Sequence, residues 1–300
     1  MNLSNDASKY EQIVEIVKAS LYMVDFIFIT TVTLLILKTV RHNSPMKKEI
    51  QYFLLCHHLL CCSVFCCFGL VYNAIRAFDA KSPQLIMWII YGVQIATGEG
   101  VLITLTLMAL NRCLAVCWPL RYLQLVHSWK HKVIICVWIT TMLKSTCLLM
   151  IEGIDKNPED IFKTEPSSLT VLGGVFARST GIILILFLII TIIISYCLLC
   201  TEGIQAGHFN SSNSKARKTV IIHGLQMSLH LLPPLIIIAV ERGSDPTILH
   251  LTAFVFFSFA QCLSPVVYGL RNKDLQIKLF NRQRNIDGPY TDHTTNSNAI

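Results

Sequence analysis

Long apolar stretches dominate the chain and alternate with short polar segments. Seven of these stretches approach the length that a helix needs to cross a bilayer, about 20 residues. Because lipid offers no hydrogen bonds to an exposed backbone, such stretches must form transmembrane helices. The pattern therefore predicts an all-α membrane protein, a bundle of seven transmembrane helices. The expected spans are 19–37, 52–75, 83–110, 133–151, 179–201, 219–240 and 246–270. The segment 111–132 is expected to be a loop on the inner side, where Pro119 would end any helix that runs on from the third span.

The charges between the spans predict the orientation of the bundle. Of the 25 Lys and Arg residues, sixteen fall on the alternate segments that include the C-terminus, eight fall on the other segments, and Lys144 lies within a span. Basic residues favour the cytoplasmic side, which places the N-terminus outside and the C-terminus in the cytoplasm. We expect an extracellular tail over 1–18, a seven-transmembrane domain over 19–270 and a cytoplasmic tail over 271–300. Within that last tail, 271–284 is predicted to form a short amphipathic helix on the inner leaflet.

The composition supports a membrane protein and argues against other classes. Only 14% of residues are charged, against about 25% in soluble domains. The net charge of +7 needs only the anionic lipid of the inner leaflet as its partner, so no nucleic acid is expected. The sequence shows no metal-ligand spacing, nucleophile elbow or phosphate-binding loop, so we predict neither an enzyme nor a bound metal or cofactor.

The outer segments carry one modification signal and no cysteine. The sequon that begins at Asn2 would face the lumen, so we expect this residue to be glycosylated. The twelve cysteines lie within apolar stretches or at the inner end of the third span. The sequence therefore predicts no extracellular disulfide bond.

Three motifs lie at the predicted inner ends of the third, sixth and seventh spans. They read MALNRCLAVCWPLRY over 108–122, KARKT over 215–219 followed by His223, and SPVVYGLRNKD over 264–274. These resemble the odorant-receptor patterns MAxDRYxAIxxPLxY, KAxxTCxxH and NPxIYxLRNKD. Ser195-Tyr196 and Pro45-Met46 are similar to two further signatures of that family, SY and PMY. The whole chain thus resembles the odorant receptors, a rhodopsin-like family of G-protein-coupled receptors, and most of all the fish-type members.

The resemblance implies a plasma-membrane receptor that binds a small-molecule odorant and activates a heterotrimeric G protein of the stimulatory type, which raises cyclic AMP. In that family, the arginine matched by Arg112 contacts a helix of the G protein, and the tyrosines matched by Tyr196 and Tyr268 swing toward it on activation. Proline kinks in the sixth and seventh spans can turn small movements into large ones. The residues expected to serve coupling and activation are Asn111, Arg112, Tyr196, His223, Pro233, Pro265 and Tyr268.

Several positions depart from the family pattern. Asn111 replaces the acid that would restrain Arg112 in an ion pair, so the inactive state is expected to be held less firmly. Cys61-Cys62 stands where the family has an aspartate, and Ser264 replaces an asparagine. These changes imply that the sodium site of the wider superfamily is absent.

By analogy to the fold, a ligand would bind between the third, fifth, sixth and seventh spans. The candidate lining is mostly apolar, which favours a small and weakly polar ligand. The expected lining residues are Tyr91, Gln94, Ile95, Gly98, Thr180, Leu184, Leu231, Leu235, Phe254, Phe257 and Ser258.

Charged and imidazole groups inside the spans raise further expectations. Glu99 and Lys144 lie at about the same depth, roughly 20 Å above the inner surface at about 1.5 Å per residue, so a pair between them is reasonable. Such a pair either fixes packing or anchors the floor of the pocket. Asp25 is expected to contact water rather than a partner, and His230 to be a hydrogen-bonded core residue.

Other functions remain open at this stage. A transporter or channel would need a polar path and paired broken spans, and neither is evident in the sequence. A membrane protein that has lost coupling through the altered motifs is a second alternative. A third is an orphan rhodopsin-like receptor outside the olfactory epithelium, which tissue expression would distinguish.

Overall fold

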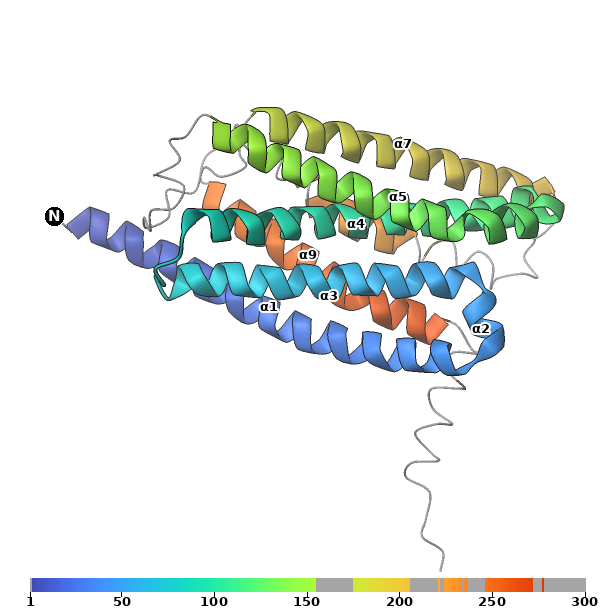
Figure 1. Ribbon diagram of the computed structural model, residues 1–300, viewed down its shortest axis with the longest axis horizontal. Coiled ribbons are helices and arrows are strands. Elements are labelled where there is room, and N and C mark those ends of the chain that lie inside the picture. The colour runs from blue at the N-terminus through green and yellow to red at the C-terminus, as the bar shows by residue number, and fades with distance from the viewer. Residues whose placement is uncertain are drawn as a thin grey trace, which may run out of the picture.

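The structure is a computed structural model in which long helices run side by side (Figure 1). It describes residues 2–154, 175–205, 221, 224–233, 235–236, 246–271 and 277. Within these ranges every regular element is a helix. The helices are α1 (Asn2–His42), α2 (Ser44–Lys48), α3 (Ile50–Ala77), α4 (Gln84–Cys117), α5 (Pro119–Ile154), α7 (Val175–Gln205) and α9 (Pro246–Arg271).

Five of these helices, α1, α3, α4, α5 and α7, are long and apolar enough to cross a membrane. A sixth apolar segment, Leu251–Val267, lies within α9. Residues 224–233 and 235–236 are helical within the predicted sixth span. The predicted all-α membrane bundle is therefore confirmed, while the segment expected as an inner amphipathic helix lies outside the described residues apart from Arg271 and Ile277.

The second inner connection differs from the prediction of a loop over 111–132. α4 continues to Cys117, and α5 begins at Pro119. Pro119 ends α4 as expected, because a proline disfavours helical backbone in the residue before it. The same proline suits the first turn of a helix, where no backbone N–H is needed, so α5 starts at once. The loop prediction was wrong because the polar residues of 119–132 belong to an extension of the fourth span.

The first helix is also longer than its apolar stretch. Residues 2–18, expected as a tail, continue α1 outward without a break. Two contacts tie this extension to the end of α3. Gln12 Nε2 donates to the Ala77 carbonyl at 3.0 Å, and Arg76 lies 3.3 Å from a carboxylate oxygen of Glu15. The side chain of Asn2 is outside what the structure describes, so its glycosylation stays a prediction.

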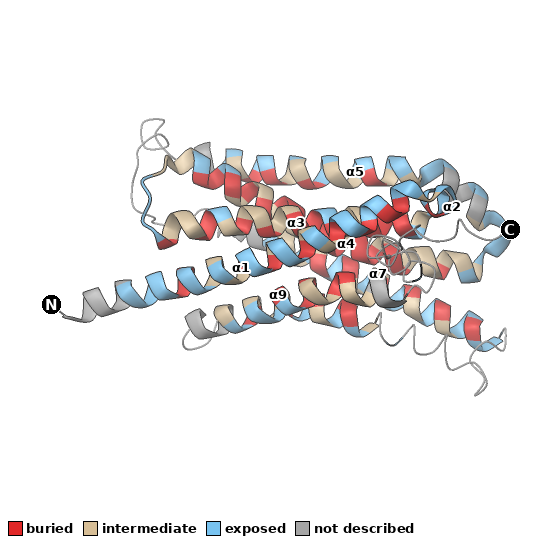
Figure 2. Cartoon of the chain, turned by 90° about the horizontal axis from the view of Figure 1, so that it is seen from below, coloured by how far each residue is buried: buried red, intermediate tan, exposed pale blue. Residues whose placement is uncertain are grey.

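α4 is the central helix of the described bundle. It packs against α3, α5 and α7, while α1 packs against α3 and α9. Figure 2 shows buried residues concentrated on α3 and α4, with exposed residues along one side of α1 and α5. The exposed residues of α7 include Ile183, Phe187 and Ile190, as expected for a helix whose outer face meets lipid.

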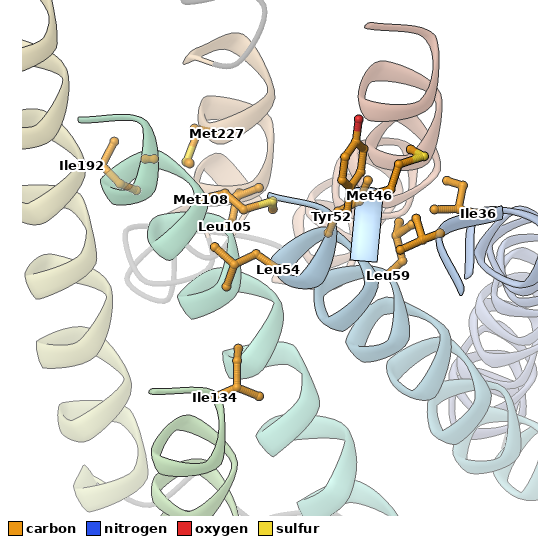
Figure 3. Packing of buried hydrophobic residues seen from close by; sticks show 13 residues of the cluster. Ile36, Met46, Tyr52, Leu54, Leu59, Leu105, Met108, Ile134, Ile192 and Met227 are labelled. Carbon is orange, nitrogen blue, oxygen red and sulfur yellow. The ribbon is translucent and has the colours of Figure 1, made fainter. Parts of the chain in front are cut away.

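The largest apolar cluster joins the inner halves of the helices. Figure 3 shows Leu54 of α3 beside Leu105 and Met108 of α4, and Leu59 of α3 beside Ile36 of α1. Met46 of the short helix α2 is buried against the same cluster, which closes the turn between α1 and α3. This packing fixes the rotation of α3 and α4, and with it the direction of their polar side chains.

Candidate functional site

A cavity of about 470 Å³ lies within the half of the bundle that the sequence predicts to be the outer half. Six of the predicted lining residues border it: Tyr91, Gln94, Ile95, Gly98, Phe254 and Phe257. Glu99 also lies at its wall. The remaining wall residues are Tyr22, Phe65, Leu102, Gly181, Ile182, Ile185, Pro233 and Ala253. The lining is aromatic and aliphatic with few polar groups, as is typical of sites for small molecules.

Five other predicted lining residues do not border this cavity. Leu184, Leu231 and Leu235 pack against the buried cluster of Leu102, Ile185 and Leu188. Thr180 is half-buried beside the lining residue Gly181. Ser258 is buried and donates a hydrogen bond to Asp25 on α1. Leu184, Leu231, Leu235 and Ser258 thus contact other buried residues instead, and a role of all five residues in ligand binding stays a prediction.

Tyr22 on α1 is a wall residue that sequence reasoning missed. Its hydroxyl accepts a hydrogen bond from Gln94 Nε2 at 2.9 Å, and its ring centroid lies 4.8 Å from that of Phe254. Gly69 on α3 allows this close approach, since a Cβ there would lie 2.6 Å from atoms of the Tyr22 ring. The first helix thus takes part in the site, although the analogy to the fold had placed the pocket between later spans.

Glu99 and Lys144 form a salt bridge across the α4–α5 interface. Their side chains are only 14% and 22% exposed, so each charge depends on the other for its solvation. Because Glu99 also borders the cavity, its carboxylate meets a ligand already paired with an ammonium group. This arrangement offers a hydrogen-bond acceptor without an unbalanced negative charge.

The expectation that Asp25 contacts water was wrong. The residue is 4% exposed, and its two carboxylate oxygens accept hydrogen bonds from Ser258 Oγ at 2.5 Å and Cys262 Sγ at 3.0 Å. Both donors lie on α9, which packs against α1. The polar partners of Asp25 are more than 230 residues away in sequence, so no local pattern could indicate them.

A buried polar network below the cavity joins four helical segments. His58 on α3 lies 3.1 Å from Thr104 Oγ1 on α4 and 2.9 Å from Ser264 Oγ on α9. Gln226 in the sixth span donates to the same Ser264 oxygen at 2.5 Å. The Thr104 hydroxyl donates to the Gly100 carbonyl at 2.7 Å, so its oxygen accepts a hydrogen bond from the N–H at His58 Nδ1. His58 Nε2 is then the acceptor for the Ser264 hydroxyl.

Two departures from the odorant-receptor pattern border this network. Cys62 Sγ lies 3.8 Å from His58 Nε2, and Ser264 bonds to the ring directly. In the odorant-receptor pattern, an aspartate stands at the position of Cys61-Cys62, and an asparagine stands at the position of Ser264. Sequence reasoning missed His58, while His230 is buried as expected, with Nδ1 3.0 Å from the Gln226 carbonyl.

Among the predicted coupling residues, Asn111, Arg112 and Tyr196 lie toward the end of the bundle that the sequence predicts to be inner, while Pro233 borders the cavity. Arg112 is half-buried in the last turns of α4, and Tyr196 on α7 packs against the inner apolar cluster. Asn111 Oδ1 accepts a hydrogen bond from the Tyr122 hydroxyl at 2.9 Å. Burial raises the pKa of Tyr122, which keeps this phenol protonated as the donor.

Four further coupling residues were predicted, and not all of them fall within the described residues. His223 lies outside them, and so does the side chain of Tyr268. Pro233 is buried within a helical stretch, and Pro265 lies inside α9, which continues to Arg271. α9 is therefore not interrupted at Pro265, although this proline supplies no N–H to the helical ladder.

Comparison with known proteins identifies the family. Residues 71–240, more than half of the chain, match the family described as serpentine type 7TM GPCR chemoreceptor Srv. The chain belongs to this family of serpentine chemoreceptors. The matched region runs from the end of α3 through α4, α5 and α7, and so includes Glu99, Lys144 and the segment around Arg112.

Individual relatives of this serpentine chemoreceptor are olfactory and odorant receptors. Olfactory receptor 4K14 of Homo sapiens is 27% identical over 205 residues, 62% of this chain and 64% of the relative. Olfactory receptor 10N1 of Mus musculus is 26% identical over 282 residues, 87% of this chain and 89% of the relative. Odorant receptor 131-2 of Danio rerio is 25% identical over 185 residues, 57% of each chain.

The first of these matches spans less than two thirds of the relative's length. The family and the apolar helices together show an odorant-receptor-like G-protein-coupled receptor, a multi-pass protein of the plasma membrane. The family is one of chemoreceptors and not of enzymes.

Proposed function

We propose that this chemoreceptor is an odorant receptor that binds a small, mostly apolar ligand in the cavity bounded by α1, α3, α4, α7 and α9. The observation that carries the proposal is the cavity itself. Its volume of about 470 Å³ falls in the range of about 300–1,000 Å³ typical of small-molecule sites. It belongs to a chain whose relatives carry the names of olfactory and odorant receptors.

The polar groups of the cavity favour a neutral ligand with a single polar end. Gln94 is engaged with Tyr22, and Glu99 is neutralised by Lys144. A ligand ammonium would need an unbalanced carboxylate to replace its hydration, and Glu99 does not provide one. A hydroxyl or carbonyl group could bond to these side chains while its hydrocarbon part contacts Phe65, Phe254 and Phe257.

Binding would be transmitted to a heterotrimeric G protein at the inner end of the bundle, with cyclic AMP as the output. Support comes from Arg112 near the inner end of α4, in a motif similar to that of odorant receptors. α4 connects the cavity to the inner end of the bundle, because it lines the cavity at Glu99 and carries Arg112 about three and a half turns further on.

Gly181 offers a direct test of the ligand site. It lines the cavity, and a Cβ at this position meets nothing within 4 Å, so a larger side chain can leave the helix here without a clash at its first atom. We expect Gly181→Phe to raise the half-maximal odorant concentration by about tenfold or more, equivalent to about 1.4 kcal/mol of binding energy. The measurement is a cyclic-AMP dose–response in cells, using an odorant selected from a panel of small aliphatic and aromatic compounds.

Ile183→Phe is the matched control, because Ile183 is 66% exposed on the outer face of the same helix. It should leave the dose–response unchanged. Equal responses of Gly181→Phe and the unmodified receptor, at equal surface level, would place the ligand elsewhere.

A further inference from the structure

A second, smaller hollow lies at the inner end of α3, α4 and α5, with a volume of about 190 Å³. It is separate from the ligand cavity and shares no residue with it. Its lining is largely aliphatic. The lining residues are Ile50, Leu54, Leu107, Leu110, Asn111, Leu114, Trp129, Lys130 and Val133.

The hollow lies where three spans end. Ile50 is the first residue of one span, Ser128 begins another just before Trp129, and Cys117 ends the third just after Leu114. Span ends lie at the boundary between hydrocarbon and lipid headgroups. α4 packs against both α3 and α5 and lies between them (Figure 1), so α3 and α5 supply the side walls of the hollow. The side walls therefore belong to helices that also face lipid.

Lys130 is the one charged residue in this apolar lining. Its ammonium group lies 6.0 Å from the centroid of the Phe53 ring, and the His131 ring lies roughly perpendicular to the same ring, with 4.9 Å between the two centroids. Trp129 beside it is 58% exposed, a position that suits an indole at the headgroup level. An apolar slot with a cation at its mouth complements a molecule with a hydrocarbon chain and an anionic head.

We propose that this hollow binds an anionic phospholipid of the adjoining leaflet, with an acyl segment between α3 and α5 and the phosphate on Lys130. The assignment to the cytoplasmic leaflet rests on the orientation that accompanies the proposed function. Basic pockets between helices on that side are suited to anionic lipid. Because Asn111 is part of the wall, the lipid would contact α4 directly beside Arg112.

The test uses the full-length purified receptor in vesicles of equal parts phosphatidylcholine and phosphatidylserine. After mild extraction, mass spectrometry of the retained lipid gives the ratio of the two lipids per receptor. We expect phosphatidylserine to be enriched over its share of the vesicle, and Lys130→Gln to reduce that enrichment by about fivefold. Lys132→Gln is the matched control, since Lys132 is exposed and does not line the hollow.

A second variant, Leu107→Phe, narrows the hollow without changing charge and should lower retention of both lipids. A thermal unfolding scan of each variant confirms that it is folded. Equal retention of the two lipids by the unmodified receptor, or equal losses in Lys130→Gln and Lys132→Gln, would overturn the proposal. Lipid retention is measured without odorant or G protein, so its failure is distinguishable from a failure of the proposed function.

Discussion

Replacing Lys144 with methionine should remove the receptor from the cell surface. The change leaves the Glu99 carboxylate, 14% exposed, without the ammonium group that solvates it. Breaking a buried pair by removing one partner costs about 3–5 kcal/mol, which is a large share of the stability of a folded chain. We therefore expect retention inside the cell and a loss of most of the surface signal from an N-terminal tag.

The double variant, Lys144→Met with Glu99→Gln, distinguishes a role of the Glu99–Lys144 pair in helix packing from a role of Glu99 in ligand recognition. It removes both charges, so no unpaired ion remains, and surface display should recover. If odorant responses recover with it, the pair serves packing alone. If display recovers but responses do not, Glu99 also acts in the cavity that it borders. Normal display of the Lys144→Met single variant would show that the pair does not support the fold.

Replacing His58 with leucine should lower the free energy of unfolding by about 2 kcal/mol. The ring joins Thr104 on α4 to Ser264 on α9, and its loss removes two buried hydrogen bonds. Each bond contributes about 1 kcal/mol, and more where a buried partner is left without a replacement. Thr104 keeps its bond to the Gly100 carbonyl, and Ser264 keeps Gln226, which limits the loss.

Thermal unfolding of the purified receptor measures this effect. His57→Leu is the control at the neighbouring position, where the ring is half-buried and stacks edge-on against Phe53. The His58 variant should unfold at a clearly lower temperature than the His57 variant. Equal midpoints would mean that the network contributes nothing to holding α3, α4 and α9 together.

The membrane-spanning helices could be predicted because length and apolar composition decide membrane insertion directly. The helix bounds could not, because polar residues beyond the spans continue the helices. Residues 2–18 extend α1, and contacts such as Gln12 with Ala77 of α3 support the extension only in three dimensions. In the same way, Pro119 marks the boundary between α4 and α5, yet whether a loop or a helix follows it depends on tertiary contacts.

The cavity was predicted best where one helical face was already evident. Tyr91, Gln94, Ile95 and Gly98 share a face of α4, and all four line the cavity. On α9, Phe254 and Phe257 line it, while Ser258 bonds to Asp25 instead. On α7, Thr180 and Leu184 were expected, but Gly181 and Ile185 are the lining residues. One residue along a helix corresponds to a rotation of about 100°, and α7 is apolar on every side, so its sequence does not indicate which face points inward.

The hydrogen-bond partners of the buried polar groups could not be predicted from sequence patterns. His58 bonds to a residue 206 positions away, and Asp25 to one 233 positions away. Only the packing of α9 against α1 and α3 brings these groups together. Glu99 and Lys144 were the exception, because two opposite charges at equal depth in neighbouring spans have few other ways to be neutralised.

The central claim, a ligand-gated receptor that signals through Arg112, is tested most directly by cyclic AMP. The full chain is expressed with a stimulatory olfactory-type G protein, with Arg112→Ala and Arg121→Ala as parallel variants and a tag that reports surface level. Arg121 is exposed on α5 and serves as the control arginine. We predict that basal and odorant-driven signals disappear in Arg112→Ala and persist in Arg121→Ala. An unchanged signal in Arg112→Ala, or no signal from the unmodified receptor at good surface level across a broad odorant panel, would contradict the claim.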